Sequence, residues 1–158
     1  MSFDSPVSQK ISGRNLHIAI VAARYNGMLV ESLLKHTMAN LALADTPAPT
    51  IERVPGSAEL PYAASVLADH TEFDAIIVLG VVIAGDTSHH DIIGSSTAQA
   101  LQEISICQEV PVINGILVVN TIEQAQDRVD GTINRGKEFA LAAMEMAQLK
   151  KKWKTTNQ

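Results

Sequence analysis

The chain has 158 residues, a net charge of −5 and 18% charged residues, a low fraction beside the roughly 25% of typical soluble domains. Its length is that of one domain, and the acidic balance excludes a globally basic surface for nucleic acid. The single cysteine, Cys107, excludes an internal disulfide and a cysteine-based zinc site, and we expect it to be a small core residue. Because no apolar run approaches the ~20 residues of a membrane span and residues 1–15 lack the apolar segment of a secretory signal, we expect a cytoplasmic protein that does not bind membranes.

The first half of the chain predicts two strands and two helices. Residues 16–22 form a short, β-branched apolar run, which is typical of a strand buried on both faces. Residues 28–44 place leucine and methionine side chains at helical spacing. A shorter and more polar strand is expected over 50–54, at an edge of the sheet, because Pro55 ends it. Residues 58–68 again have the spacing of a helix.

The second half continues the alternation. Apolar runs predict buried strands over 74–82 and 110–119, and residues 92–106 between them have helical spacing. Thr121 and Gln124 have the spacing of a helix-capping box.

Two glycines, Gly131 and Gly136, are expected to divide the last region into two helices. The second of these helices is predicted from about Lys137 to Lys150, where lysines suit a helix C-terminus.

Alternating strands and helices predict a flavodoxin-like three-layer α/β/α sandwich with a four-stranded parallel sheet. We expect a single domain over residues 1–158, with an N-terminal arm over 1–14 and a basic tail over 151–158. Ligands of such folds bind at the carboxyl ends of the strands, so the loops after the four strands are expected to meet at one edge.

The loop after the third predicted strand contains Gly85, Asp86, Thr87 and Ser88. Backbone N–H groups and hydroxyls at the start of a helix bind anions, and phosphate is the natural ligand. The carboxylate of Asp86 repels a phosphate, so it must point away or cap the helix. The same residues are also compatible with a capped helix start that binds nothing, and the residues alone leave both interpretations open.

Two histidines, His89 and His90, follow this loop directly. Histidine can donate or accept a proton near neutral pH. Adjacent side chains point in different directions, so at most one of the two is expected to face a ligand. The alternative is a pair of exposed histidines in a first helical turn. A metal site is not expected, because no remote residue of ligand type accompanies them.

Three other side chains have both a functional and a structural interpretation. Tyr25 can stack on a planar heterocycle or be an ordinary half-buried tyrosine. Glu59 can accept hydrogen bonds from a polyol or interact only with the helix dipole. Arg128 lies in a polar helix, where on its own it is typical of a solvated ion-pair partner.

Taken together, the loops resemble those of the 6,7-dimethyl-8-ribityllumazine synthase family. The matching segments run in family order and spacing from about Asn15 to Ala147. They are ARYN over 23–26, VPGSAELP over 54–61, GVVIAGDTSH over 80–89, VPVINGIL over 110–117, and IEQA over 122–125 continuing to Arg128.

The resemblance implies an enzyme of riboflavin biosynthesis that needs neither a cofactor nor a metal. Such a transferase condenses 5-amino-6-(D-ribitylamino)uracil with 3,4-dihydroxy-2-butanone 4-phosphate. A Schiff base forms, phosphate is eliminated, and the ring closes with loss of water. Holding the two reactants together is expected to supply much of the acceleration.

The same resemblance assigns roles to individual residues. Tyr25 takes the place of the aromatic residue that stacks on the pyrimidine, and backbone groups of Val82 and Ile83 meet the uracil edge. The ribityl chain is expected at Ser57, Ala58 and Glu59. The phosphate is expected at Gly85, Asp86 and Thr87, with Arg128 as its counter-charge. His89 is at the position of the general acid/base, and His90 is at a position usually held by an aromatic residue.

Some positions depart from the family pattern. Ala84 replaces an arginine, and Asn114 replaces a phenylalanine that covers the pyrimidine from a neighbouring subunit. Val118 and Val119 replace two threonines. Arg135 replaces a lysine that contacts the uracil, in a loop that is one residue shorter than in many members. Asn114 and Arg135 remain candidate substrate-binding residues, and we expect the affinity for substrate to differ from that of other family members.

The resemblance also implies a homo-oligomer. The family is built from pentamers with active sites between subunits, and some members assemble twelve pentamers into a 60-subunit shell. Contact with other subunits would explain the low charged fraction of this chain. Because the last loop departs from the Gly-Thr-Lys pattern of shell-forming members, we expect a free pentamer.

Two other functions are open at this point. The changes at Ala84 and Asn114 are compatible with a non-catalytic relative that binds flavin or lumazine or forms a shell, although His89 and Arg128 are retained. A flavodoxin-like electron carrier is disfavoured, because residues 23–27 lack a Thr/Ser/Gly-rich phosphate-binding loop.

Overall fold

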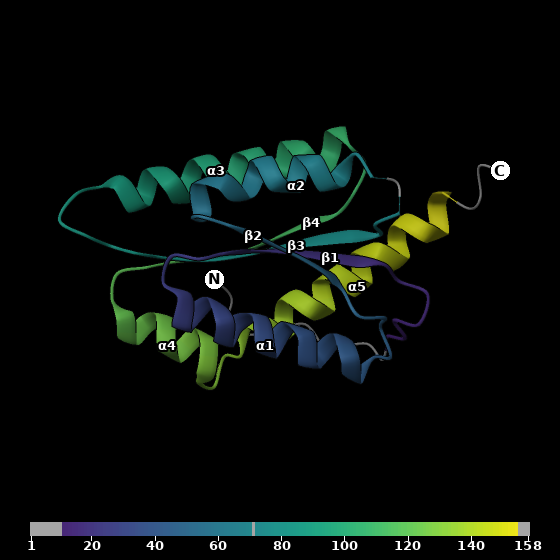
Figure 1. Cartoon of the computed structure of the whole chain (residues 1–158), viewed down its shortest axis with the longest axis horizontal. Helices are drawn as coiled ribbons and strands as arrows, with labels where there is room; N and C mark the ends of the chain where they lie inside the picture. The colour runs from purple at the N-terminus through teal and green to yellow at the C-terminus, as the bar shows by residue number, and fades with distance from the viewer. Residues whose placement is uncertain (1–10, 71, 155–158) are drawn as a thin grey trace.

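Four strands form one parallel sheet in the order β2-β1-β3-β4 (Figure 1). The structure is a computed structural model that describes residues 11–70 and 72–154. The strands are β1 (Ile18–Ala23), β2 (Thr50–Val54), β3 (Ala75–Ile83) and β4 (Val112–Val119). The prediction that β2 is an edge strand is confirmed by this order.

Helices cover both faces of the sheet, which confirms the flavodoxin-like three-layer α/β/α fold. In Figure 1, α2 and α3 lie on one face, and α1, α4 and α5 lie on the other. The α-helices are α1 (Gly27–Leu43), α2 (Leu60–Ala68), α3 (His89–Cys107), α4 (Ile122–Asp130) and α5 (Arg135–Lys154), and the short 3-10 helix η1 (Ser57–Glu59) precedes α2.

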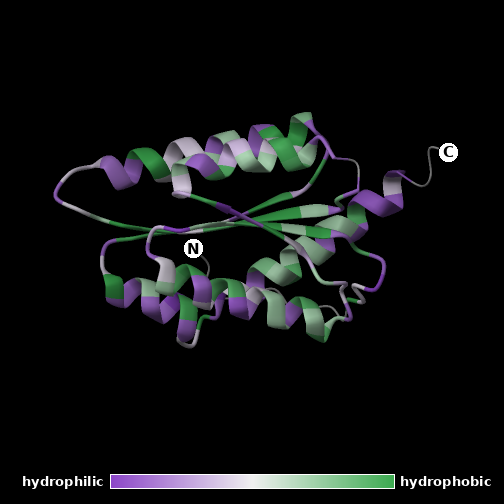
Figure 2. Ribbon diagram, viewed as in Figure 1, coloured by the Kyte–Doolittle hydropathy of each residue, from purple (hydrophilic) through white to green (hydrophobic). Residues whose placement is uncertain are grey.

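The two faces of the sheet have separate apolar cores because successive side chains of a strand point in opposite directions. In β1, Ile18 and Ile20 pack toward α1 and α5, whereas Ala19 and Val21 pack toward α2 and α3. Figure 2 shows the apolar strands lying between the helix layers. This two-sided burial explains why the strands read as continuous apolar runs in the sequence.

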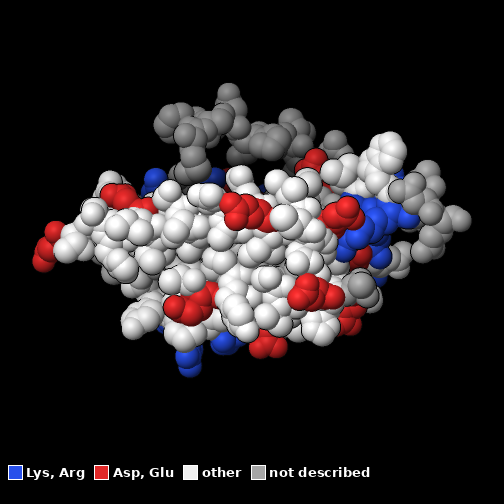
Figure 3. Space-filling view, turned by 90° about the horizontal axis from the view of Figure 1, so that it is seen from above, with Lys and Arg blue, Asp and Glu red and all other residues white. Residues whose placement is uncertain are grey.

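The α2–α3 face carries little charge. Figure 3 views the molecule from this side, where isolated acidic residues are separated by broad uncharged surface. Basic side chains gather at one end of the view, and the last turn of α5 contains Lys151, Lys152 and Lys154. Among the described helices, none is both long and apolar enough to cross a membrane.

Two expectations from the sequence are corrected by the structure. The predicted division of this region into two helices is confirmed, and Gly131 ends α4, but Gly136 lies inside α5 and does not interrupt that helix. The absence of a side chain lets α5 approach α1, because a Cβ at Gly136 would lie 2.7 Å from Cβ of His36 and 2.8 Å from the Leu33 carbonyl oxygen. Cys107, which resembles a small core residue in the sequence, is exposed at the end of α3.

The terminal segments predicted as an arm and a tail are only partly described. Residues 1–10 and 155–158 lie outside the described residues. Within the described part, the Ser12 carbonyl oxygen accepts a hydrogen bond from Gln148, and the Gly13 N–H donates to the Ala44 carbonyl oxygen. Residues 151–154 belong to α5.

The register of the parallel strands determines the shape of the carboxyl edge. Ala22 of β1 pairs with Leu79 of β3, so β1 ends level with Gly80. Strand β3 continues to Ile83, which pairs with Val119 of β4. The end of β3 therefore extends past β1 and keeps a strand neighbour only on the β4 side.

We predict that Gly136→Ala destabilises the protein by about 1–3 kcal/mol, because the added methyl group collides with α1 and the backbone must shift. Gly27→Ala at the start of α1 is the matched control, since a Cβ there meets no atom within 4 Å. The control should leave stability unchanged or slightly raised. Thermal unfolding of both variants tests this prediction, and equal unfolding temperatures would contradict the proposed close contact of α1 and α5.

Candidate active site

Tyr25 lies at the carboxyl edge on the loop between β1 and α1. The backbone N–H groups of Arg24 and Tyr25 donate to the carbonyl oxygens of Val54 (3.0 Å) and Pro55 (3.1 Å), which ties this loop to the end of β2. The Tyr25 side chain is 75% exposed. Its ring lies against Gly56, where a Cβ would approach the Cδ2 atom of Tyr25 to 3.0 Å. The backbone of Tyr25 is therefore held in place, and its ring has an accessible face for a planar partner.

Asn26 joins the same loop to β3, a role that the sequence reasoning did not find. Its side-chain Nδ2 donates to the Val81 carbonyl oxygen at 2.8 Å. Its backbone is left-handed, with φ of 55°, a conformation that asparagine tolerates better than most residues. The sequence signal is the residue type itself, because Asn directly before a helix often occupies such a turn.

The loop after β2 is packed directly onto β3. Ser57 is buried, and Gly80 leaves room for it, since a Cβ at Gly80 would lie 2.4 Å from the Ser57 Oγ. Glu59 folds back to accept a hydrogen bond from the Gly56 N–H at 2.8 Å. Ala58 and Glu59 remain exposed at the edge beside Tyr25. This arrangement presents a carboxylate and an open backbone next to the aromatic ring.

Val82 and Ile83 lie on the part of β3 that extends past β1. They pair with Val118 and Val119 of β4, while their other edge has no strand beside it. Both residues are partly exposed. Backbone donors and acceptors on an open strand edge can pair with a ligand that offers a complementary edge.

Residues 85–88 form an exposed loop at the start of α3. Within the described residues, the backbone N–H groups of residues 85–90 donate no hydrogen bond. Ser88 is the N-cap of α3, yet its side chain makes no capping hydrogen bond. The N–H groups at this helix start therefore remain available to an anion, and the helix dipole favours negative charge at the same place.

The two histidines have different surroundings. His89 is exposed. The His90 side chain is only 16% exposed, and its Nδ1 lies 3.1 Å from the Thr87 carbonyl oxygen. The prediction that the two side chains point in different directions agrees with this difference. Of the two, His89 is the one that is accessible to a ligand.

The comparison with known proteins identifies the family. The sequence profile of the 6,7-dimethyl-8-ribityllumazine synthase family matches residues 15–151, which is most of the chain. The chain belongs to this family.

Three archaeal relatives named 6,7-dimethyl-8-ribityllumazine synthase match over nearly their whole length. The relative from Thermococcus kodakarensis is 34% identical over 146 residues, covering 92% of this chain and 94% of the relative. The relative from Thermococcus onnurineus is 36% identical over 143 residues, covering 90% and 94% respectively. The relative from Thermococcus gammatolerans is 34% identical over 140 residues, covering 89% and 91%.

Three of the predicted site residues are not brought to the carboxyl edge with the others by this single chain. Asn114 pairs with Val78, and at about 3.3 Å per residue it lies well before the end of β3. Arg128 belongs to α4, on the face opposite α3, and its Nη1 donates to the Gln124 carbonyl oxygen at 3.0 Å. Arg135 forms an ion pair with Glu138 at the start of α5.

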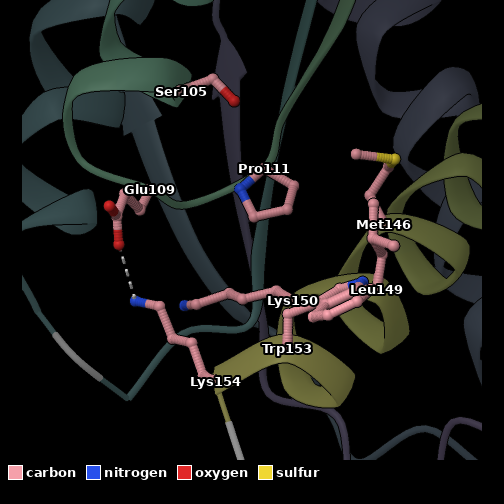
Figure 4. Close-up of a pocket in the computed structure, with 8 residues that line it drawn as sticks. All are labelled: Ser105, Glu109, Pro111, Met146, Leu149, Lys150, Trp153 and Lys154. Carbon is pink, nitrogen blue, oxygen red and sulfur yellow. Dashed lines mark ion pairs between the residues drawn. The ribbon is translucent and has the colours of Figure 1, made fainter. Parts of the chain in front are cut away.

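A groove elsewhere on the molecule is separate from this edge. It lies between the end of α3, the start of β4 and the end of α5 (Figure 4), near the amino ends of the strands. Trp153, Met146 and Leu149 supply its apolar wall. Lys150 donates to the Phe73 carbonyl oxygen at 2.6 Å, and burial lowers the pKa of its ammonium group. None of the residues that resemble the family's site lines this groove.

We predict that two different replacements of Asn26 lower the free energy of unfolding by different amounts. Asn26→Gly removes only the hydrogen bond to Val81, while Asn26→Ala also forces a Cβ-bearing residue without a polar side chain into the left-handed region. The alanine variant should therefore be less stable than the glycine variant by about 1–2 kcal/mol. Chemical unfolding of both variants measures the difference. An alanine variant as stable as the glycine variant would contradict the left-handed backbone at this position.

Proposed function

We propose that this protein is a 6,7-dimethyl-8-ribityllumazine synthase. It condenses 5-amino-6-(D-ribitylamino)uracil with 3,4-dihydroxy-2-butanone 4-phosphate, a transferase reaction of riboflavin biosynthesis. The observation that carries the proposal is the family match over residues 15–151, together with the meeting of three matching segments, 23–26, 54–61 and 80–89, at one edge of the sheet.

The pyrimidine and its ribityl chain occupy the edge beside Tyr25. The exposed ring of Tyr25 stacks on the pyrimidine, and the open edge of Val82 and Ile83 pairs with the polar edge of the uracil. The ribityl hydroxyls contact Ser57, Ala58 and Glu59, whose carboxylate accepts hydrogen bonds from a polyol. The tie between Glu59 and the Gly56 N–H fixes this carboxylate before the substrate arrives.

The phosphate of the second substrate binds at the start of α3. The N–H groups of Gly85, Asp86 and Thr87 are without acceptors in the described structure, and Arg128 supplies the positive charge. Asp86 is exposed, so its carboxylate can point away from the phosphate into solvent. The site then holds the ketone next to the amine of the pyrimidine.

The reaction needs proton transfers more than it needs a nucleophile from the protein. The substrate amine attacks the ketone carbonyl and releases water to give a Schiff base, and elimination of phosphate follows. That elimination removes the C3 proton and leaves an enol, which tautomerises to a ketone at C3. The ribityl-bearing nitrogen attacks this ketone, which closes the ring and releases a second water. His89 is exposed at the phosphate loop and serves as the general acid/base for these steps. Positioning of two bound reactants supplies much of the rate.

A homopentamer supplies the missing residues. Arg128, Asn114 and Arg135 reach the site of a neighbouring subunit. The α2–α3 face supports an interface of this kind, because it is largely uncharged (Figure 3) and exposes apolar side chains. These are Tyr62 (77% exposed), Val66 (44%), Ile92 (60%) and Ile106 (76%). We propose a free pentamer in the cytoplasm, and sedimentation of the pure protein separates this assembly from a monomer and from a 60-subunit shell.

We expect the purified protein to convert the two substrates into a fluorescent lumazine without added metal or cofactor. The rate should exceed that of the uncatalysed condensation and should increase in proportion to protein concentration. Fluorescence measured at several protein concentrations provides the test. A rate equal to the uncatalysed one at every concentration would exclude the synthase, and tight lumazine binding without turnover would favour a non-catalytic relative.

Arg128→Ala should raise the KM for the phosphate-bearing substrate by about tenfold or more, because the charge-assisted contact with phosphate is lost. The KM for the pyrimidine substrate should change little. Arg14→Ala is the control, since Arg14 forms an exposed ion pair with Asp45 away from the strand ends. Steady-state kinetics with each substrate varied in turn measures both constants. An unchanged KM for the phosphate substrate would make Arg128 a surface charge only.

A further inference from the structure

The His90 side chain contacts two acceptor groups at the start of α3. Its Nδ1 lies 3.1 Å from the Thr87 carbonyl oxygen, and its Nε2 lies 3.4 Å from Oδ1 of Asp91. The ring is mostly buried, whereas the neighbouring His89 is exposed. His90 is therefore held within the protein, and it is not available as the general acid/base.

The contact with Thr87 determines which nitrogen of His90 carries a proton. A carbonyl oxygen can only accept a hydrogen bond, so Nδ1 must be the donor. On the other side of the ring, Nε2 lies 3.4 Å from the Asp91 carboxylate. A side chain with a donor at the Nδ1 position is thus required for the Thr87 contact.

Holding the Thr87 carbonyl oxygen also fixes the next N–H group. The peptide unit is planar and trans, so the Ser88 N–H points away from the Thr87 carbonyl oxygen. With this oxygen held at His90, the Ser88 N–H is directed away from the ring, and no described residue accepts a hydrogen bond from it. If the contact with His90 were lost, rotation of the peptide unit could turn an oxygen toward a bound anion.

We propose that His90 is a positioning residue for the phosphate-binding loop, where it holds the Thr87–Ser88 peptide with its N–H directed to the substrate phosphate. This inference rests on the proposed function, which places the phosphate at residues 85–88. His90 acts through the loop and does not touch the substrate. Its replacement should therefore affect the phosphate-bearing substrate and leave binding of the pyrimidine unchanged.

Two substitutions of His90 separate the effect of its hydrogen-bond donor from the effect of the ring's volume. His90→Asn keeps an N–H donor near the position of Nδ1, and His90→Phe keeps a ring without any donor. The phenylalanine variant should raise the KM for the phosphate substrate about tenfold, the loss expected for one hydrogen bond. The asparagine variant should stay within about threefold of the unsubstituted protein. His70→Phe, at an exposed histidine after α2, is the control and should change neither KM.

Titration with inorganic phosphate gives a second readout that does not need turnover. Calorimetry should show weaker phosphate binding by His90→Phe, with binding by His90→Asn and His70→Phe close to that of the unsubstituted protein. The KM for the pyrimidine substrate and the circular dichroism spectrum report whether each variant is folded.

The outcomes separate this inference from the proposed function. If the unsubstituted protein binds phosphate but does not turn over, the synthase function fails and the phosphate titration still decides the role of His90. Equal phosphate affinity in all variants would overturn the inference while leaving the synthase function intact. A loss shared by both substrates, or a loss in His90→Asn as large as that in His90→Phe, would assign His90 a structural role and also overturn it. Absence of phosphate binding by the unsubstituted protein would remove the site itself.

Discussion

The candidate site depends on the difference in length between β3 and its neighbour β1. Parallel pairing places the carboxyl ends of the strands at one edge, and the register lets β3 continue from Val81 to Ile83 after β1 has ended. The loop after β1 folds into the space beside this extension and is attached to it by Asn26. The loop after β2 packs onto Gly80 through Ser57. A longer β1 would pair with the backbone of Val82 and Ile83 and close the edge to a ligand.

The part of this arrangement that follows from residue patterns was predictable from the sequence. Apolar runs identify strands buried on both faces, and parallel strands with helical connections place the loops after 23, 54, 83 and 119 at one edge. Contacts between remote segments were not predictable in the same way. A glycine in a sequence can mark either the end of a helix or a close contact between two helices. At Gly136, only the position of α1 shows that the glycine permits a close contact. The contact of Asn26 with Val81 likewise depends on a register that local patterns do not specify.

The predicted site residues separate into two groups in the structure. The first group meets at one edge, because each of its members directly follows or ends a strand. It contains Tyr25, the η1 residues, the end of β3 and the phosphate loop. Asn114, Arg128 and Arg135 lie on other surfaces of the chain, and no local signal in the sequence indicates this. If neighbouring subunits complete each other's sites, one arrangement explains three observations. These are the separation of the three residues, the low charged fraction of the chain and the apolar α2–α3 face.

Mixed oligomers of two variants show whether residues of two chains form one active site. Tyr25→Ala and Arg128→Ala each remove one side of the site. When the two variants are unfolded and refolded together in equal amounts, about a quarter of the sites should combine an intact Tyr25 from one chain with an intact Arg128 from its neighbour. Lumazine formation by the mixture should therefore rise to about a quarter of the unsubstituted rate. A mixture no more active than the mean of the two separate variants would show that each chain must supply both residues to its own site, and would contradict a site shared between neighbouring chains.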